Sequence, residues 1–432
     1  MRPDHDGPGG DRLVIEGGIP LRGEVVVSGS KNAALPEMAA ALLSSGPLLL
    51  HNVPEIEDVG TMCSILESLG VKAKRRSEQV EIDPSGLAGG APDLAAAGRM
   101  RASLLLLGPL LAATGEVTLP RPGGDDIGAR RIEQHVVGLR QMGAEVDDSG
   151  SGIRARAGRL HGAHILLDMP TVTGTENLMM AAVRAEGITI ISNAAREPHV
   201  VDLALCLNSM GARITGAGTD RVVVEGVAVL HQAEHRVRSD YVEAGTYALA
   251  AAATGGDLLI RDAFPEDLTQ LLHKLRQAGC QVEEGAGWIR VARQGSVTAV
   301  DMTTWPHPGF ATDLQSQYVA LMTQANGDAT VWEALYENRF RPVEQLRRLG
   351  ARIDVEGRIA VVHGGHPLHG ADLDVTDIRS GAALVIAGLC ADGTTTCRNV
   401  RHLDRGYQNL VGKLARVGAR LSRRPEPERA GA

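Results

Sequence analysis

Hydrophobic and polar positions follow one order along this chain: an amphipathic stretch, a short turn centred on glycine, and an alternating stretch. In 201–210 and in 268–277 the apolar residues fall at steps of three and four, which predicts helices with one buried face. The alternation in 221–225 predicts a strand. The glycine of the turn supplies the left-handed backbone that ends the preceding helix. Each copy of the pattern therefore predicts a helix followed by a strand.

The turn occurs six times, and successive glycines are 73, 68, 68, 71 and 68 residues apart. Helix–glycine–strand junctions are common in proteins, which would explain each copy but not the near-constant interval. A repeat of roughly 70 residues is too long for a solenoid or a propeller and fits a unit of about two helices and several strands. We therefore predict an α/β fold of two domains, each with three units, with helices inside and sheets outside. The turns are Leu69-Gly70-Val71, Met142-Gly143-Ala144, Met210-Gly211-Ala212, Ala278-Gly279-Cys280, Leu349-Gly350-Ala351 and Val417-Gly418-Ala419.

Composition narrows the possible functions. The 432 residues carry a formal net charge of −8 and only 3% aromatic residues, which argues against broad binding to nucleic acid or to a membrane surface. No apolar run approaches the roughly 18 residues of a membrane helix, and the first residues do not resemble a secretory signal, so a cytoplasmic location is expected. The cysteines lie far apart without a CxxC pair, which predicts reduced thiols and argues against a zinc site. They are Cys63, Cys206, Cys280, Cys390 and Cys397.

Two glycine-containing segments are candidates for binding an anion. Residues 28–32 read Ser-Gly-Ser-Lys-Asn between a predicted strand and a predicted helix, so backbone amides and Lys31 can face a phosphate or carboxylate. The Walker A spacing is absent, and a surface lysine at a helix start is the alternative interpretation. Residues 122–131 hold three glycines, two acids and two arginines, which predicts a loop that closes over an anionic substrate. A solvated turn is the alternative there.

Further charged residues stand at equivalent junctions of the repeats. Arg101 opens an apolar helix, and Asp313, Arg379 and Arg405 follow the same kind of turn. Taken singly, such Asp–Arg neighbours are most often structural ion pairs. If the basic groups converged with Lys31 they would form a site for a substrate with several negative charges.

At these residues the sequence resembles the enolpyruvyl transferases over 13–422. Within the family it is more similar to the members that act on UDP-N-acetylglucosamine than to those of the shikimate branch. The resemblance implies two inside-out α/β barrels, each of three repeated βαβαββ-like units, with the active site in the cleft between them. The matching segments are 29–36 (GSKNAALP), 100–103 (MRAS), 108–110 (GPL), 193–198 (NAAREP), 306–313 (PHPGFATD), 337–340 (ENRF) and 404–407 (DRGY).

The resemblance also implies domain boundaries and a reaction. Residues 31–238 would form the first domain, which carries the 122–131 loop, and 11–30 with 239–424 the second. Residues 1–10 and 425–432 are expected to be disordered tails. Family members move the enolpyruvyl group of phosphoenolpyruvate to a hydroxyl of the acceptor and release phosphate, through a tetrahedral intermediate and without a metal or an organic cofactor.

Site residues carry over to the positions that match the family motifs. Catalytic roles are implied for Asp125, Asp313, Lys31 and Arg405. Phosphoenolpyruvate would be bound by Lys31, Asn32, Arg130, Arg379 and Arg405. The uridine-nucleotide acceptor would be bound by Asn32, Arg101, Arg130, Arg131, Ile132, Glu133, Gln134, Met169, Pro170, Thr171, Val172, Asp313 and Leu335. Asp313 is also placed to take the proton of the acceptor hydroxyl.

One departure from the family lies in the loop, where the usual Gly-Gly-Cys reads Gly123-Gly124-Asp125. The cysteine's assigned role is to protonate the methylene carbon of phosphoenolpyruvate, and fosfomycin alkylates it. We expect Asp125 to replace it as the acid. An aspartate donates a proton only while protonated, so activity should shift toward acid pH, and the enzyme should be insensitive to fosfomycin because it lacks the thiolate.

Other departures lie on the acceptor side. The usual Arg-Pro-Val-Asp-Leu-His reads Arg-Arg-Ile-Glu-Gln-His at 130–135, and Thr173 stands where glycine is usual. Tyr241 replaces an arginine, and His199 replaces an acid. The expected acceptor is UDP-N-acetylglucosamine, in peptidoglycan precursor synthesis. The alternative is a paralogue that acts on another nucleotide, such as uridine monophosphate (UMP) in nucleoside-antibiotic assembly, and a catalytically idle, ligand-binding paralogue is a third possibility.

Overall fold

The computed structural model describes residues 11–125, 127–129 and 132–425. The chain divides into two compact units. Unit 1 comprises Met1–Val27, Asp126–Ala129 and Tyr241–Ala432, and unit 2 comprises Ser28–Asp125 and Arg130–Asp240. The expected tails 1–10 and 426–432, and the site residues Arg130 and Arg131, lie outside the described residues.

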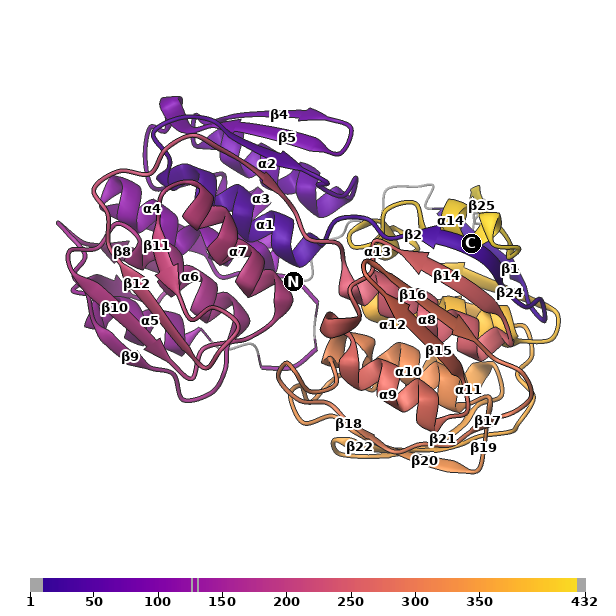
Figure 1. Cartoon of the computed structure of the whole chain (residues 1–432). Coiled ribbons are helices and arrows are strands. Elements are labelled where there is room, and N and C mark those ends of the chain that lie inside the picture. Colours follow the sequence, from indigo (N-terminus) through magenta and orange to yellow (C-terminus); the bar gives the residue numbers. More distant parts are fainter. Residues whose placement is uncertain (1–10, 126, 130–131, 426–432) are drawn as a thin grey trace. The chain divides into compact units, whose positions relative to one another are not determined.

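Unit 2 has three sheets around a helical interior (Figure 1). The first sheet has the order β13-β3-β5-β4, with β13 parallel to β3, and the third has the order β11-β12-β10-β9, with β9 parallel to β10. The second has the order β6-β8-β7. The strands are β3 (Leu48–His51), β4 (Lys72–Arg76), β5 (Gln79–Asp83), β6 (Glu116–Pro120), β7 (Glu145–Asp147), β8 (Gly152–Arg156), β9 (His164–Leu166), β10 (Ile188–Ser192), β11 (Arg213–Thr215), β12 (Arg221–Glu225) and β13 (Ala233–Arg236).

The helices of unit 2 are of two kinds. The most buried are α1 (Lys31–Ala40) and α6 (Val172–Ala182), together with the first half of α4 (Leu107–Thr114). The others present one face to this interior, as the amphipathic patterns predict. They are α2 (Glu57–Ser68), α3 (Leu94–Arg99), α5 (Glu133–Gln141) and α7 (Pro198–Ser209), with the 3₁₀ turns η1 (Ala41–Leu43), η2 (Pro84–Gly86) and η3 (Arg101–Leu106).

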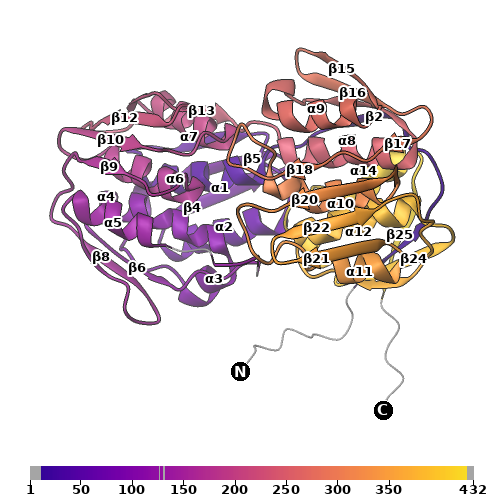
Figure 2. The ribbon, with the colours of Figure 1, turned by 90° about the horizontal axis from the view of Figure 1, so that it is seen from below.

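Unit 1 repeats this plan, with sheets β15-β16-β14-β2, β18-β20-β22-β21 and β23-β24-β1-β25 and a short pair β17-β19. Helices α8 (Tyr241–Thr254), α10 (Gln315–Met322) and α12 (Ile378–Cys390) fill its interior, with the strands outside them (Figure 2). The strands are β1 (Asp11–Glu16), β2 (Arg22–Val26), β14 (Asp257–Arg261), β15 (Gln281–Gly285), β16 (Trp288–Ala292), β17 (Val297–Thr298), β18 (Met302–Thr303), β19 (Ala325–Asn326), β20 (Asp328–Trp332), β21 (Arg352–Glu356), β22 (Ile359–His363), β23 (Asp372–Asp374), β24 (Thr394–Arg398) and β25 (Arg420–Pro425).

The remaining helices of unit 1 are only partly buried. They are α9 (Thr269–Gln277), α11 (Val343–Arg348), α13 (Arg401–Asp404) and α14 (Leu410–Arg416), with 3₁₀ turns η4 (Pro265–Asp267) and η5 (Thr312–Leu314). Both units are thus inside-out α/β barrels with helices enclosed by sheets.

The repeat predicted from glycine is confirmed in the backbone. All six turn glycines have a positive φ, from 86° at Gly70 to 100° at Gly418. Each follows a helix, and strands follow the turns, as at α7, Gly211 and β11. An L side chain is strained in that conformation, so glycine is required for the tight reversal.

One predicted boundary is wrong by one residue. Pro425, which we expected in the C-terminal tail, ends strand β25 opposite Asp11 of β1. Strand β25 lies at the edge of its sheet, so the missing N–H of proline costs no ladder hydrogen bond on a second side. Among the described residues, no helix is long and apolar enough to cross a bilayer.

Candidate active site

Lys31 begins helix α1 and has a fixed position. Ser30 caps the helix, because its hydroxyl accepts the N–H of Ala33 at 3.4 Å. The Lys31 Nζ lies 2.5 Å from Asp58 Oδ2, and the lysine side chain is only 13% exposed. A Cβ at Gly29 would lie 1.6 Å from the carbonyl oxygen of Asn52, so only glycine allows this approach. The motif is therefore a packed helix start rather than a solvated surface lysine, and Asn32, half-buried, follows directly.

The two segments of unit 2 that the resemblance assigns to the acceptor lie against each other. The Gln134 side chain spans the gap, because its Nε2 donates to the Met169 carbonyl at 3.3 Å and its Oε1 accepts the Met169 N–H at 3.5 Å. Ile132 and Glu133 lead into α5, while Thr171 caps α6 by accepting the N–H of Gly174. The remaining residues of the second segment, Pro170 and Val172, are half-buried.

A buried histidine supports these segments from behind. His135 is 1% exposed and lies 3.2 Å from both the Thr173 hydroxyl and Asn177 Nδ2. Burial and the charge of Arg101 lower the pKa of His135 to about 3, so the ring is neutral. The Asn177 amide nitrogen can only donate, so Nδ1 of the ring accepts and Nε2 carries the proton toward Thr173.

The same asparagine fixes the segment that carries Arg101. Asn177 Nδ2 also donates to the Leu104 carbonyl at 2.8 Å, and its Oδ1 accepts the N–H of Gly108 at 2.8 Å. Arg101 opens η3, which ends at Leu106, and is half-buried. The network from Thr173 to Leu104 therefore holds the Arg101 turn and the acceptor segments as one body.

The 122–131 loop begins where its backbone passes very close to the backbone of helix α3. A Cβ at Gly123 would lie 2.2 Å from the Gly98 carbonyl oxygen, and Gly124 has a φ of 103°. Asp125 follows and is half-buried in unit 2. Glycine at 123 allows the loop to pass close to α3, and glycine at 124 allows the positive φ that precedes Asp125.

In unit 1 the structure brings Asp313 and Arg379 together. Arg379 Nη2 donates to Asp313 Oδ2 at 2.9 Å, and Arg339 donates to Oδ1. Both arginines are 6% exposed. Burial opposes ionisation of Asp313, but Arg379 and Arg339 outweigh it and hold the pKa of Asp313 well below its usual range. The carboxylate is therefore charged and carries two cations.

Arg339 is a residue whose role the sequence did not reveal. It lies in the 337–340 motif, but nothing in the spacing shows that it pairs with Asp313. Its burial in the structure is what indicates a partner, since an arginine is almost never fully buried without one.

A buried glutamate orders the residues beside Asp313. Glu333 is 0% exposed and accepts hydrogen bonds from the hydroxyls of Thr304 and Thr312, at 2.9 and 2.8 Å. It also accepts the backbone N–H groups of Leu335 at 2.9 Å and Tyr336 at 3.1 Å. One carboxylate thus positions both Leu335 and the η5 turn that carries Asp313.

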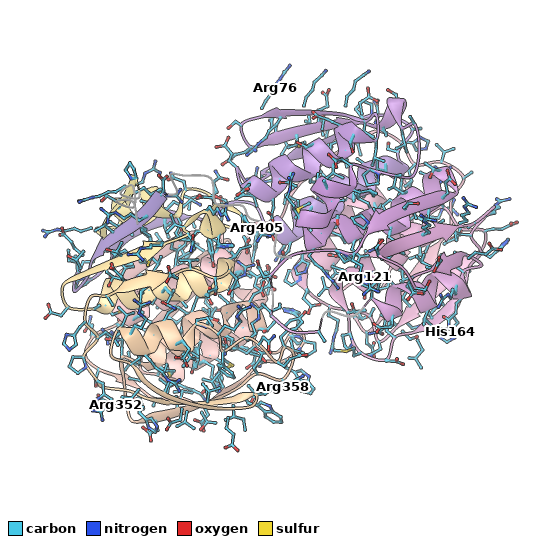
Figure 3. The ribbon with its side chains drawn as sticks, turned by 180° about the vertical axis from the view of Figure 1, so that it is seen from behind. Arg76, Arg121, His164, Arg352, Arg358 and Arg405 are labelled. Atoms are coloured by element: carbon cyan, nitrogen blue, oxygen red, sulfur yellow. The ribbon has the colours of Figure 1, made fainter. Side chains whose placement is uncertain are left out.

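Arg405 follows α13 and is labelled in Figure 3. Two residues on, Tyr407 is 2% exposed, and its ring centre lies 5.8 Å from the Arg379 guanidinium carbon. This stacking places the 404–407 segment next to Arg379. The capping box of α12, in which Asp377 accepts the N–H of Arg379 at 2.9 Å, fixes the backbone of that arginine.

The profile of the EPSP synthase (3-phosphoshikimate 1-carboxyvinyltransferase) family matches residues 15–414, nearly the whole chain. The chain belongs to the EPSP synthase family. Enolpyruvyl transfer is the reaction of this family, as the motifs of the sequence indicated.

Solved structures of the EPSP synthase family resemble this chain over its full length. The enolpyruvyl transferase NikO from Streptomyces tendae is 27% identical, with a TM-score of 0.87, over 97% of this chain and all of that one. Two structures of EPSP synthase from Acinetobacter baumannii are 19% identical, with TM-scores of 0.75, and cover 96% and 95% of this chain and 100% and 99% of theirs. At that identity the EPSP synthases show the common fold alone.

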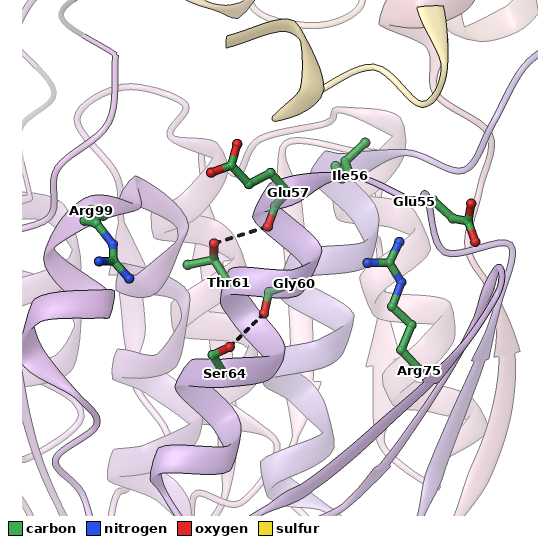
Figure 4. Close-up of a pocket in the computed structure, with 8 residues that line it drawn as sticks. All are labelled: Glu55, Ile56, Glu57, Gly60, Thr61, Ser64, Arg75 and Arg99. Carbon is green, nitrogen blue, oxygen red and sulfur yellow. Dashed lines mark hydrogen bonds between the residues drawn. The ribbon is translucent and has the colours of Figure 1, made fainter. Parts of the chain in front are cut away.

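An open depression on unit 2 of this family member holds none of the predicted site residues (Figure 4). Its hydroxyls are used by helix α2 itself, since Thr61 donates to the Glu57 carbonyl and Ser64 to the Gly60 carbonyl, each at 3.2 Å. Glutamates and arginines together surround it, so it has no single charge sign that would select an anion. The lining residues are Glu55, Ile56, Glu57, Gly60, Thr61, Ser64, Arg75 and Arg99.

Proposed function

We propose that this protein transfers the enolpyruvyl group of phosphoenolpyruvate to a hydroxyl of UMP and releases phosphate. The supporting observation is a contrast within the site residues. Lys31, Arg379 and Arg405, which the family resemblance assigns to phosphoenolpyruvate, are retained. Gln134 and Thr173 on the acceptor side replace the usual leucine and glycine and make new contacts.

These contacts favour a smaller acceptor. Gln134 closes onto the Met169 backbone, and Thr173 adds a methyl and a hydroxyl group where glycine would leave space. UMP lacks the sugar and the second phosphate of UDP-N-acetylglucosamine and needs less room. Its phosphate monoester also carries close to two negative charges, which suits the additional arginine at position 131.

The similarity to other enolpyruvyl transferases argues against 3-phosphoshikimate as the acceptor. Identity is 27% with NikO and 19% with the EPSP synthases, which favours a branch separate from 3-phosphoshikimate transfer. The sugar nucleotide remains the second candidate, because the 306–313 and 337–340 motifs resemble those of enzymes that use it.

In the proposed reaction Asp125 gives a proton to the methylene carbon of phosphoenolpyruvate, and Asp313 takes the proton of the acceptor hydroxyl. The hydroxyl oxygen bonds to the central carbon, which gives a tetrahedral intermediate. The carbon–oxygen bond to phosphate then breaks, phosphate leaves, and loss of a methyl proton restores the alkene. When Arg379 turns to the substrate's anionic groups, Asp313 loses one of its two cations and becomes a stronger base.

The deciding measurement is phosphate release from phosphoenolpyruvate with UMP or UDP-N-acetylglucosamine, from acid to neutral pH. We expect kcat/KM to be at least about tenfold higher with UMP, a difference of roughly 1.4 kcal/mol in transition-state binding. Turnover with the sugar nucleotide alone would instead support wall-precursor synthesis. No phosphate release with either acceptor would contradict the proposal.

A double variant tests the assigned cause. Gln134→Leu with Thr173→Gly restores the usual residues and should raise activity with UDP-N-acetylglucosamine relative to UMP. The matched control is Arg405→Ala, which should reduce turnover with either acceptor because it acts on phosphoenolpyruvate. If the ratio of activity with UDP-N-acetylglucosamine to activity with UMP is unchanged in the double variant, Gln134 and Thr173 do not determine the choice of acceptor.

The same assay tests Asp125 as the acid. Turnover should survive incubation with fosfomycin, and Asp125→Cys should become sensitive to it, because the variant supplies the thiolate that the compound alkylates. Covalent inactivation of the unaltered protein would contradict the assignment.

A further inference from the structure

Unit 2 contains a second group of chemically active side chains, away from every residue assigned above. Glu37 comes from α1, Asp202 and Cys206 from successive turns of α7, and His235 from β13. Helix α7 packs against both α1 and β13 (Figure 2). Glu37 and Cys206 are 0% exposed, and the side chains of Asp202 and His235 are 7% and 13% exposed.

The carboxylate of Glu37 is buried without adequate hydrogen bonding. Neither of its oxygens has a hydrogen-bond partner, and the nearest cationic group, His235 Nε2, lies 3.5 Å from Oε1. Leaving a buried carboxylate in this condition is costly unless a proton or a cation neutralises it. The cluster therefore has acceptor capacity that its protein groups leave unused.

The donor atoms are close enough to share one ion. One donor atom each from Glu37, Cys206 and His235 lie within 4.8 Å of one another, and His235 Nε2 is 3.0 Å from Asp202 Oδ1. Bonds of about 2.0–2.3 Å to a tetrahedral zinc ion separate its ligand atoms by roughly 3.3–3.8 Å. A small inward movement of these side chains gives that arrangement.

The geometry points to a binding site for a divalent transition metal of the zinc class, with Glu37, Cys206 and His235 as ligands and Asp202, which is bonded to His235, beside them. Three protein ligands leave a fourth position, which a rotation of the Asp202 side chain would fill, and a closed set of four is typical of structural zinc sites. Carboxylates suit the charge of the ion, and the protons of the Cys206 thiol, the His235 imidazolium and the Glu37 carboxyl group, whose pKa is raised well above its usual range, pass to solvent as the metal bonds form. The ion would fasten α1, which begins at Lys31, to α7 and β13.

A backbone contact supports this role by orienting one ligand. The N–H of Arg238 donates to Asp202 Oδ2 at 2.6 Å and leaves Oδ1 directed at His235. Outer hydrogen bonds of this kind are a regular feature of metal-binding carboxylates. The cysteine spacing along the chain argued against a zinc site because it considers neighbours in sequence, whereas these ligands come from three separate elements.

The competing occupant is a proton. Burial lowers the pKa of His235, but Asp202 and Glu37 outweigh burial and raise it to about 10. Burial also raises the pKa values of Glu37 and Cys206 above their usual ranges. Protons on all three ligands therefore compete with the metal, so the affinity for the metal should rise with pH.

The test uses the full chain, stripped with a chelator and titrated with Co²⁺ and then Zn²⁺. We expect one Co²⁺ per chain to give a thiolate-to-cobalt charge-transfer absorption, which Zn²⁺ displaces. Cys206→Ser should remove that absorption, and Cys63→Ser, which alters another buried thiol of unit 2, should keep it. Zn²⁺ should raise the thermal unfolding midpoint of the protein and of Cys63→Ser, and should leave that of Glu37→Gln unchanged.

Absence of the absorption in the unaltered protein, or its survival in Cys206→Ser, overturns the site. An equal response of Glu37→Gln and the unaltered protein to Zn²⁺ overturns the ligand set. The unaltered chain and Cys63→Ser decide the matter even if Glu37→Gln does not fold. Phosphate release is not part of the readout, so the result is independent of the proposed function.

Discussion

Each unit holds a carboxylate among ionisable neighbours, half-buried in unit 1 and fully buried in unit 2, with opposite results. Asp313 of unit 1 has two arginines, whose charges outweigh burial and keep its pKa well below the usual range. Glu37 of unit 2 is buried near Asp202, and burial together with that negative charge raises its pKa well above the usual range. Burial pushes both acids in the same direction, so the sign of the neighbouring charge decides which one is ionised.

The largest expected effect comes from removing the charge at Asp313. Asp313→Asn keeps the side-chain size but eliminates the proposed base and leaves Arg339 and Arg379 facing an amide. We expect phosphate release to fall by about a thousandfold, within the range of lost acid–base catalysis. Asp257→Asn is the control in the same unit, because Asp257 is bound by Arg290 at 2.8 and 2.9 Å but is 32% exposed. Activity of the Asp313 variant within tenfold of the parent would contradict the proposed role.

A smaller effect is expected from removing His235, the cationic side chain beside Glu37 and Asp202 in unit 2. His235→Ala leaves Glu37 and Asp202 buried together without a positive neighbour. In metal-free protein we expect a loss of about 3 kcal/mol of stability, as for a broken buried ion pair, measured from urea unfolding. His161→Ala, at a side chain 60% exposed, should change stability by less than about 0.5 kcal/mol. Equal losses of stability in the two variants would show that His235 contributes no more to stability than an exposed histidine.

The smallest effect, counted per pH unit, is a dependence of stability on pH, in which one histidine of unit 2 acts above pH 6.5 and another below it. The pKa of His235 is raised to about 10, so its contribution is complete below pH 6.5 and is lost as pH rises through 10. The pKa of His135 is lowered to about 3, so its contribution is present above pH 6.5 and is lost as pH falls toward 3.

Each group changes stability by at most about 1.4 kcal/mol per pH unit. We expect urea midpoints of the metal-free protein to be highest near pH 6.5. His235→Gln should flatten the alkaline side alone, and His135→Gln the acid side alone. A variant that flattens the wrong side would contradict the assigned charge state of that histidine.

The sequence predicted the architecture because its signals are local. Each turn glycine and each amphipathic helix is specified by about ten neighbouring residues, so the repeat shows without any tertiary contact. The 221–225 strand and the 268–277 helix are found within one residue of their predicted ends. Pro425 was missed because pairing with Asp11, across the whole chain, decides its conformation.

The site was less accessible to sequence reasoning. The type of residue at Asp313 and Arg379 indicated chemistry, but their pairing and the participation of Arg339 depend on how η5 and α12 pack. The link from Thr173 through His135 to Asn177 joins three segments that no periodicity connects. Glu37 is the extreme case, since in the sequence it is one acid in an apolar helix, and its neighbours come from α7 and β13.

The position of β1 between β24 and β25 sets an order of events during synthesis. Every described residue of unit 2 leaves the ribosome before residue 241, so that unit can fold while the rest is still being made. Strand β1 is translated first, but it stays without its neighbours until residues 394–425 emerge. Strand β1 is thus incorporated only when residues 394–425 have been made, whereas β2 can pair with β14 as soon as residues 257–261 are available. Until residues 394–425 emerge, β1 must not pair with any other strand.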